Sequence, residues 1–74
     1  MGAEIEAHIA RQLRIRRRLS GLTLQEVAKR AGITFQQVQK YETGANRVSA
    51  ARLVLLARAL GTEAAYFFQG LDLE

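Results

Sequence analysis

The sequence contains no cysteine, no proline and no tryptophan, and it has one methionine and one histidine. Because cysteine is absent, no disulfide bond and no thiolate metal site can stabilise the fold. The 74 residues are enough for one small domain. Its stability must therefore come from a compact apolar core, which a partner subunit could extend.

Residues suited to catalysis are also scarce. The one histidine, His8, has neither a cysteine nor a nearby aspartate as a partner, and we expect it to lie on the surface. The sequence contains no cluster of metal ligands, no phosphate-binding loop and no pair of nucleophile and base. We therefore predict a protein that is not an enzyme and that uses no catalytic residue, metal, cofactor or small-molecule ligand.

Long apolar runs are missing as well. No uncharged run approaches the roughly 20 residues that a membrane span requires. The first residues, MGAEIEAHIARQL, are acidic at the start and lack the apolar segment of a signal peptide. An arginine-rich helix could lie on a membrane surface, but the core needs its aliphatic residues. We therefore expect a cytoplasmic protein that does not associate with membranes.

Basic residues are concentrated in the middle of the chain. All eleven lysines and arginines lie between Arg11 and Arg58, and only two acids, Glu26 and Glu42, share that segment, which gives it a net charge of +9. The other five acids lie outside it, at Glu4, Glu6, Glu63, Asp72 and Glu74. A basic centre is typical of proteins that bind nucleic acid. The simpler alternative is a solvated basic surface.

The spacing of apolar residues predicts a single all-α domain over residues 1–74, with five helices and no strand. The helices are expected at about 4–19, 24–31, 35–43, 50–60 and 63–69. In the first, Ile5, Ile9 and Leu13 repeat at helical spacing and form a stripe for the core. The opposite face carries Arg11, Arg14 and Arg18.

Helix-capping residues predict where four of these helices begin. Thr23 with Glu26, and Thr34 with Gln37, have the spacing of capping boxes, in which each side chain satisfies a backbone N–H at the helix start. The other two expected caps are Ser49 and Thr62.

The second and third helices are joined by about three residues. Gly32 permits the left-handed backbone of a tight turn, and Ala28 is small where the two helices approach. This arrangement is the helix-turn-helix pattern, in which two helices cross at about 90–120°.

Four segments, IARQLRIRR, EVAKRAGIT, VQKYETG and LVLLARALG, resemble in this order the helix-turn-helix domain of the phage repressor and Cro type, also called the xenobiotic-response-element family. The resemblance runs from about Ile9 to Leu71. It implies a compact five-helix DNA-binding domain of the lambda-repressor-like type. The implied function is that of a sequence-specific transcriptional regulator that binds double-stranded DNA and acts as a repressor. An antitoxin or a protein-interaction module with the same fold remains the alternative.

The resemblance implies that helix 35–43 enters the major groove of DNA. The positions that match base contacts are Phe35, Gln36, Gln37 and Lys40. Glutamine can bind adenine N6 and N7, lysine can reach guanine O6 and N7, and phenylalanine can pack on a thymine methyl group. We expect Gln36, Gln37 and Lys40 to share one side of the helix and Gln39 to point elsewhere, toward solvent or phosphate.

Contacts to the DNA backbone are expected at helix starts and in the loop after the recognition helix. The candidate residues are Thr23, Gln25, Thr34, Asn46 and Arg47. The family usually has glutamine directly after the cap of its second helix, whereas this chain has Leu24 there and Gln25 one position later. The corresponding phosphate contact therefore falls to Gln25 or is lost.

Two further expectations come from the resemblance. Arg17 and Glu42 match a partly buried ion pair that braces the recognition helix, with Arg16 as the alternative partner. The C-terminal Phe67, Phe68 and Leu71 either fill the end of the core or form a dimer interface. We expect a homodimer that binds a near-palindromic operator, with recognition helices about 34 Å apart.

Overall fold

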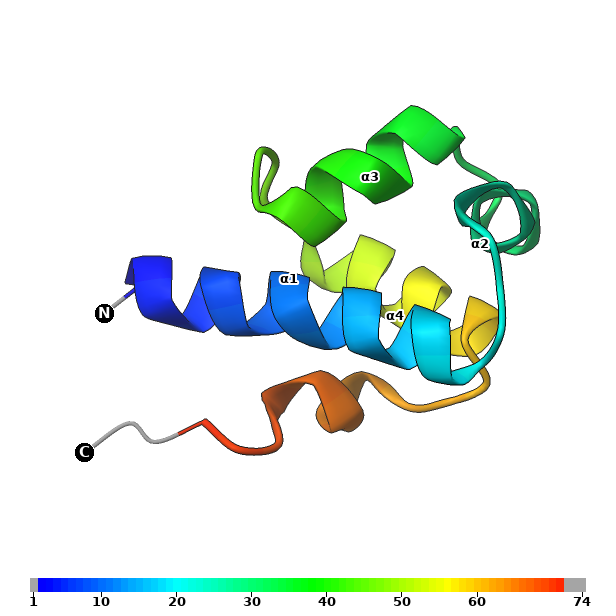
Figure 1. Cartoon of the computed structure of the whole chain (residues 1–74). Coiled ribbons are helices and arrows are strands. Elements are labelled where there is room, and N and C mark those ends of the chain that lie inside the picture. Colours follow the sequence, from blue (N-terminus) through cyan, green and yellow to red (C-terminus); the bar gives the residue numbers. More distant parts are fainter. Residues whose placement is uncertain (1, 72–74) are drawn as a thin grey trace.

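The structure, a computed structural model, describes residues 2–71 (Figure 1). This part of the chain contains four α-helices and one 3-10 helix: α1 (Gly2–Leu19), α2 (Leu24–Ala31), α3 (Phe35–Thr43), α4 (Ala50–Ala59) and η1 (Ala64–Phe68). No strand occurs between residues 2 and 71. The described residues do not include Asp72 and Glu74, nor the two ends of the predicted domain 1–74.

The predicted capping boxes are confirmed at the starts of α2 and α3. Thr23 Oγ1 accepts a hydrogen bond from Glu26 N at 3.1 Å, and Glu26 Oε1 accepts one from Thr23 N at 3.0 Å. Thr34 and Gln37 repeat this exchange at 3.2 and 3.0 Å. Each box satisfies backbone donors that the first helical turn leaves without partners.

The prediction of a fifth α-helix at 63–69 is wrong, because the structure has a five-residue 3-10 helix there. Its backbone hydrogen bonds join residues three positions apart: Tyr66 N donates to Glu63 O at 3.0 Å, and Gln69 N donates to Tyr66 O at 3.2 Å. Thr62 does not cap it, because the N-cap position is Glu63 and no side chain caps the helix. A segment this short cannot repay the cost of nucleating an α-helix, so its packing on α1 decides its form.

The core lies between the helices and is closed by one aromatic side chain. In Figure 1, α3 crosses one side of α1 and η1 lies along the opposite side, with α4 behind. Phe67 of η1 is completely buried, and Leu56 of α4 and Val27 of α2 are each 1% exposed. Phe67 therefore fills the end of the core, which is one of the two alternatives for the C-terminal aromatic residues.

His8 lies in the interior and not on the surface, contrary to the prediction. It is 9% exposed, and its Nε2 lies 2.7 Å from the carbonyl oxygen of Gln69. Because a carbonyl oxygen can only accept, Nε2 carries the proton and donates. The bond fastens the chain after η1 to the first half of α1, a contact between residues that are far apart in the sequence.

Two arginines cover the carbonyl groups at the C-terminal end of α4. Arg16 donates from Nε to Leu60 O at 3.2 Å, and its guanidinium lies 5.3 Å from the centre of the Tyr66 ring. Arg30 donates to Ala59 O at 3.3 Å. Cations are favourable at a helix C-terminus because they oppose the helix dipole and satisfy free carbonyl groups.

Replacing Phe67 with alanine is expected to lower the free energy of unfolding by about 3–5 kcal/mol, because it leaves a cavity that the core cannot close. Phe68→Ala is the matched control: Phe68 is 45% exposed, so its loss should cost about 1 kcal/mol or less. Urea denaturation followed by circular dichroism measures both. Equal losses in the two variants would show that η1 does not close the core.

Candidate nucleic-acid interface

The turn between α2 and α3 sets the direction of α3. Gly32 has φ +73°, in the left-handed region, and Ile33 N donates to Ala28 O at 3.0 Å. Glycine adopts this conformation without the steric penalty that a Cβ would bring. Figure 1 shows α2 nearly end-on while α3 lies across the view, so the two helices cross steeply, as in a helix-turn-helix.

The outer face of α3 is polar. Val38 and Tyr41 are buried against the core, and Phe35 is 39% exposed. The exposed polar residues of the helix are Gln36, Gln39, Lys40 and Thr43. Of the four predicted base-contacting residues, Phe35, Gln36 and Lys40 are therefore accessible.

Gln37 differs from the other three, because its side chain is half-buried and already engaged. Its Oε1 accepts the hydrogen bond from Thr34 N in the capping box. A glutamine that binds adenine uses its carbonyl oxygen as well as its amino group. While the box is intact, Gln37 can therefore offer a base its amino group and only the second lone pair of its carbonyl oxygen. By contrast, the exposed side chain of Gln36 makes no hydrogen bond to any residue between 2 and 71.

Gln39 is exposed and lines a recess between α1, α2 and α3. The recess also contains Arg14, Leu24 and Thr43. Arg14 is exposed. The amide of Gln39 thus lies on the side of α3 that faces the start of α2, where a phosphate contact is expected.

The start of α2 offers mixed features to a phosphate group. The hydroxyl of Thr23 accepts one bond in the capping box, and the side chain of Gln25 is exposed. The hydrogen bonds from the backbone and the side chain of Thr23 lower the pKa of the Glu26 carboxyl below its ordinary value. Glu26 is therefore ionised near neutral pH and places a negative charge at this helix start, which opposes a second anion.

A nearly buried ion pair fastens α3 to α1. Arg17 Nε lies 2.6 Å from Glu42 Oε2 and Arg17 Nη2 lies 3.0 Å from Glu42 Oε1. Their side chains are 14% and 6% exposed. Arg17 Nη1 also donates to Leu22 O at 3.1 Å, in the turn before α2. The hydrogen bond with Glu42 raises the pKa of Arg17, against the opposing effect of desolvation, and Coulomb attraction adds to it. The structure thus brings Glu42 together with Arg17 and directs Arg16 to α4.

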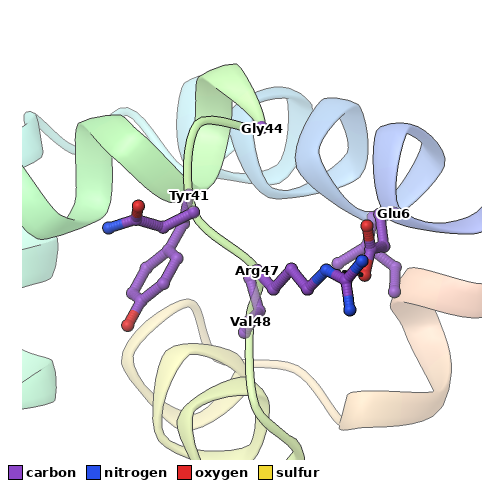
Figure 2. A pocket seen from close by; sticks show the side chains of 7 residues that line it. Glu6, Tyr41, Gly44, Arg47 and Val48 are labelled. Atoms are coloured by element: carbon purple, nitrogen blue, oxygen red, sulfur yellow. Dashed lines mark ion pairs between the residues drawn. The ribbon is translucent and has the colours of Figure 1, made fainter. Parts of the chain in front are cut away.

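The loop after α3 begins at Gly44, whose φ is +80°, and returns toward α1. Asn46 N donates to Lys40 O at 3.2 Å, and its side chain is exposed. Arg47 reaches across to α1, where its Nε lies 3.0 Å from Glu6 Oε1 (Figure 2). Both expected phosphate-contacting residues of this loop are accessible, and one of them already pairs with an acid.

The predicted dimer residues do not share one environment. Phe67 is completely buried within the chain and cannot contact a partner, whereas Phe68 is 45% exposed. Leu71 is half-buried. Two exposed apolar residues that the sequence reading did not single out, Val54 and Leu55 on α4, are each 41% exposed.

Residues 13–67 match the helix-turn-helix family model HTH_3. This span is most of the chain and includes the turn, α3 and α4. The chain belongs to the HTH_3 family of helix-turn-helix transcriptional regulators. The family prediction is confirmed, and the family is one of regulators and not of enzymes.

Curated relatives of the HTH_3 domain are bacterial regulators. It is 44% identical over 68 residues to an uncharacterized transcriptional regulator in the ATPase CF(0) region of Rhodospirillum rubrum, a match that covers 92% of this chain and 63% of that protein. It is 43% identical over 65 residues to the HTH-type transcriptional regulator y4wC of Sinorhizobium fredii, with 88% of this chain and 46% of that protein covered. The chain thus spans about half to two thirds of the length of these relatives.

Solved structures share the fold of the HTH_3 domain. The restriction-modification controller protein C.AhdI from Aeromonas hydrophila has a TM-score of 0.82 and 29% identity, over 89% of this chain and 98% of that one. An HTH_3 family transcriptional regulator from Vibrio cholerae has a TM-score of 0.86 and 26% identity, over 92% of this chain and 38% of that one. The predicted all-α, lambda-repressor-like fold is confirmed, with a 3-10 helix in the fifth position.

Two features are absent from the described residues of the HTH_3 domain. None of the helices between residues 2 and 71 has the length and apolar character needed to cross a membrane. The same residues contain no group of three or more metal-binding side chains of the histidine, cysteine or carboxylate type.

The sequence reading missed the contact between Glu6 and Arg47 and the bond from His8 to Gln69. Both join residues that are distant in the chain, and neither has a local spacing that would reveal it. The sequence gives a weak indication of the role of Arg30, because cations are common near helix C-termini. Arg30 belongs to the last turn of α2, however, and it binds a carbonyl group at the end of α4.

Replacing Arg17 with alanine is expected to lower the free energy of unfolding by about 3–5 kcal/mol, because the buried Glu42 carboxylate loses its partner. Arg18→Ala removes the same charge from an exposed neighbour and should change stability by about 0.5 kcal/mol or less. Thermal and urea denaturation of the two variants provide the comparison. If both variants melt like the unmodified protein, the pair does not brace α3.

Proposed function

We propose that this HTH_3 domain binds double-stranded DNA at specific sequences, with the first turns of α3 in the major groove, and that it acts as a transcriptional repressor. The observation that carries the proposal is the exposed, uncommitted amide of Gln36 at the second position of α3. A helix fits the major groove, and residues near its N-terminus point at base edges. An amide in this place can bind adenine through both of its polar atoms.

The neighbouring residues complete the proposed base contacts. Lys40 lies one turn after Gln36 on the exposed face and can reach guanine O6 or N7, and the exposed part of Phe35 can pack on a thymine methyl group. Gln37 contributes chiefly through its amino group, because its carbonyl oxygen already accepts a bond in the capping box.

Contacts to the DNA backbone would position α3 without carrying sequence information. We assign them to the two residues of the loop after α3, to the threonine caps and to the exposed amides beside the start of α2. These residues are Asn46, Arg47, Thr23, Thr34, Gln25 and Gln39. The carboxylate of Glu26 weakens the contribution of α2, so that Arg47 becomes the main backbone contact.

The proposal includes a homodimer on a near-palindromic operator. Phe68 and Leu71 supply its contact, since Phe67 is buried within the chain. Two recognition helices would then lie about 34 Å apart, one turn of DNA. Repression requires only that the bound domain exclude other proteins from the same DNA. We also propose a cytoplasmic location, which the bacterial origin of the relatives supports.

Selection of random duplex DNA by the purified protein at roughly physiological salt tests the function. The expected result is a near-palindromic site with half-sites one helical turn apart, and a reporter gene carrying that site then measures the sign of regulation. If the protein shows only general, salt-sensitive binding and enriches no sequence, α3 does not read bases. A protein-interaction module with this fold would then be the better description.

Gln36→Ala is expected to weaken binding to the selected site and to relax its preference at one or two base pairs, by about 1–3 kcal/mol of discrimination. Gln39→Ala is the matched control, because it removes the same amide from the same helix at the proposed backbone position. It should leave base preference unchanged. Repeating the selection with each variant compares them. Unaltered preference in Gln36→Ala would contradict the assignment of α3 as the reading helix.

A further inference from the structure

Glu6 forms an ion pair with Arg47, an exposed residue of the proposed DNA interface. Its Oε1 lies 3.0 Å from Arg47 Nε, and the side chains of Arg47 and Glu6 are 86% and 42% exposed. Figure 2 shows Arg47 extending from the loop after α3 to Glu6 on α1. The pair therefore remains in water, where a third charged group can reach it.

The other acids near the interface are used differently. Glu42 is paired with Arg17 and nearly buried, and Glu26 closes the capping box of α2. Glu6 alone, among the acids of residues 2–71, engages an arginine that is left accessible to DNA. Its carboxylate presents to Arg47 the same anionic oxygens that a phosphate would present.

A guanidinium binds carboxylate and phosphate through the same planar set of N–H donors. A phosphate that approaches Arg47 must either displace Glu6 from Nε or bind the remaining donors with the Glu6 carboxylate close by. The first course breaks an ion pair, and the second places two anions side by side. Both reduce the net gain from the phosphate contact.

We propose that Glu6 competes with DNA phosphate for Arg47 and thereby lowers the affinity of the domain for all DNA sequences alike. This inference rests on the proposed function. Because exposed ion pairs are weak, the effect corresponds to about a two- to five-fold change in Kd. Phosphates carry no sequence information, so specific and non-specific DNA are affected equally. Salt screens the exposed pair, so the effect shrinks as ionic strength rises.

Fluorescence anisotropy with the full chain tests the inference, with a labelled duplex of random sequence and a duplex of the selected site as probes. Glu6→Gln should bind both duplexes about two- to five-fold more tightly at low salt. Glu4→Gln is the matched control, since it removes the same charge from an exposed position of the same helix. It should show a smaller gain than Glu6→Gln.

A double substitution identifies the group through which Glu6 acts. Arg47→Gln should weaken binding to both duplexes and lower the slope of log K against log salt by about one. In that background, Glu6→Gln should give no more gain than Glu4→Gln. Circular dichroism confirms that each variant is folded.

Three results would overturn the inference: equal gains from the two glutamate substitutions, weaker binding by Glu6→Gln, or a full gain that persists without Arg47. The unmodified protein reports on the function separately. If it binds neither duplex, the proposed function and the inference both fail. If it binds and the Glu6 series shows no specific gain, the inference alone fails.

Discussion

The orientation of α3 depends on the ion pair between Arg17 and Glu42. An isolated helix of nine residues is unstable in water, and α3 buries only Val38 and Tyr41 as full members of the core. These side chains hold α3 against α1 and α2, but apolar packing is not directional. The pair adds two hydrogen bonds at 2.6 and 3.0 Å near the C-terminal end of α3. Because both side chains are shielded, any other position of the helix would leave a buried charge without a partner, which is costly.

The same arginine also joins α3 to the preceding turn. Its third hydrogen bond goes to the carbonyl of Leu22, just before the cap of α2. One side chain of α1 thus fixes both parts of the helix-turn-helix relative to the first helix. The exposed face of α3, including Gln36 and Lys40, is therefore placed by contacts on the opposite side of the helix, away from the bases that we propose it reads.

Internal contacts also reduce the number of basic residues that remain for DNA. Arg16 and Arg30 donate to the carbonyl groups at the end of α4, and Arg17 is neutralised by Glu42. The net charge of the central segment already subtracts Glu42, but it includes Arg16 and Arg30, so it still overstates the charge that is free for a phosphate backbone. Arg47 is accessible but shares its charge with Glu6. Composition indicates the class of partner correctly, whereas the three-dimensional contacts determine which charges can reach it.

Much of the fold could be predicted from local patterns. The capping boxes depend on residues three positions apart, and α2 and α3 begin at the positions those boxes require. The 3-10 helix could not be predicted in this way, because its form is set by Phe67 packing into a core built from other helices. The bonds from His8 to Gln69 and from Arg47 to Glu6 join segments that only the fold brings together. The resemblance assigned positions to the candidate site, but it could not show which of two adjacent glutamines has a free side chain.

The two capping boxes differ in a way that bears on DNA binding. The box of α2 uses the carboxylate of Glu26, and the box of α3 uses the neutral amide of Gln37. In each box this side chain accepts a hydrogen bond from the backbone N–H of the N-cap threonine. A carboxylate accepts it more strongly than an amide, because the bond is charge-assisted. At the start of a helix that enters the major groove, however, a carboxylate would face phosphates on both sides and be repelled by them. The weaker, neutral box at the start of α3 is therefore what the proposed function requires. In the function that we propose, the chief role of Gln37 is to keep the start of the helix formed and uncharged, so that Gln36 beside it can meet the bases.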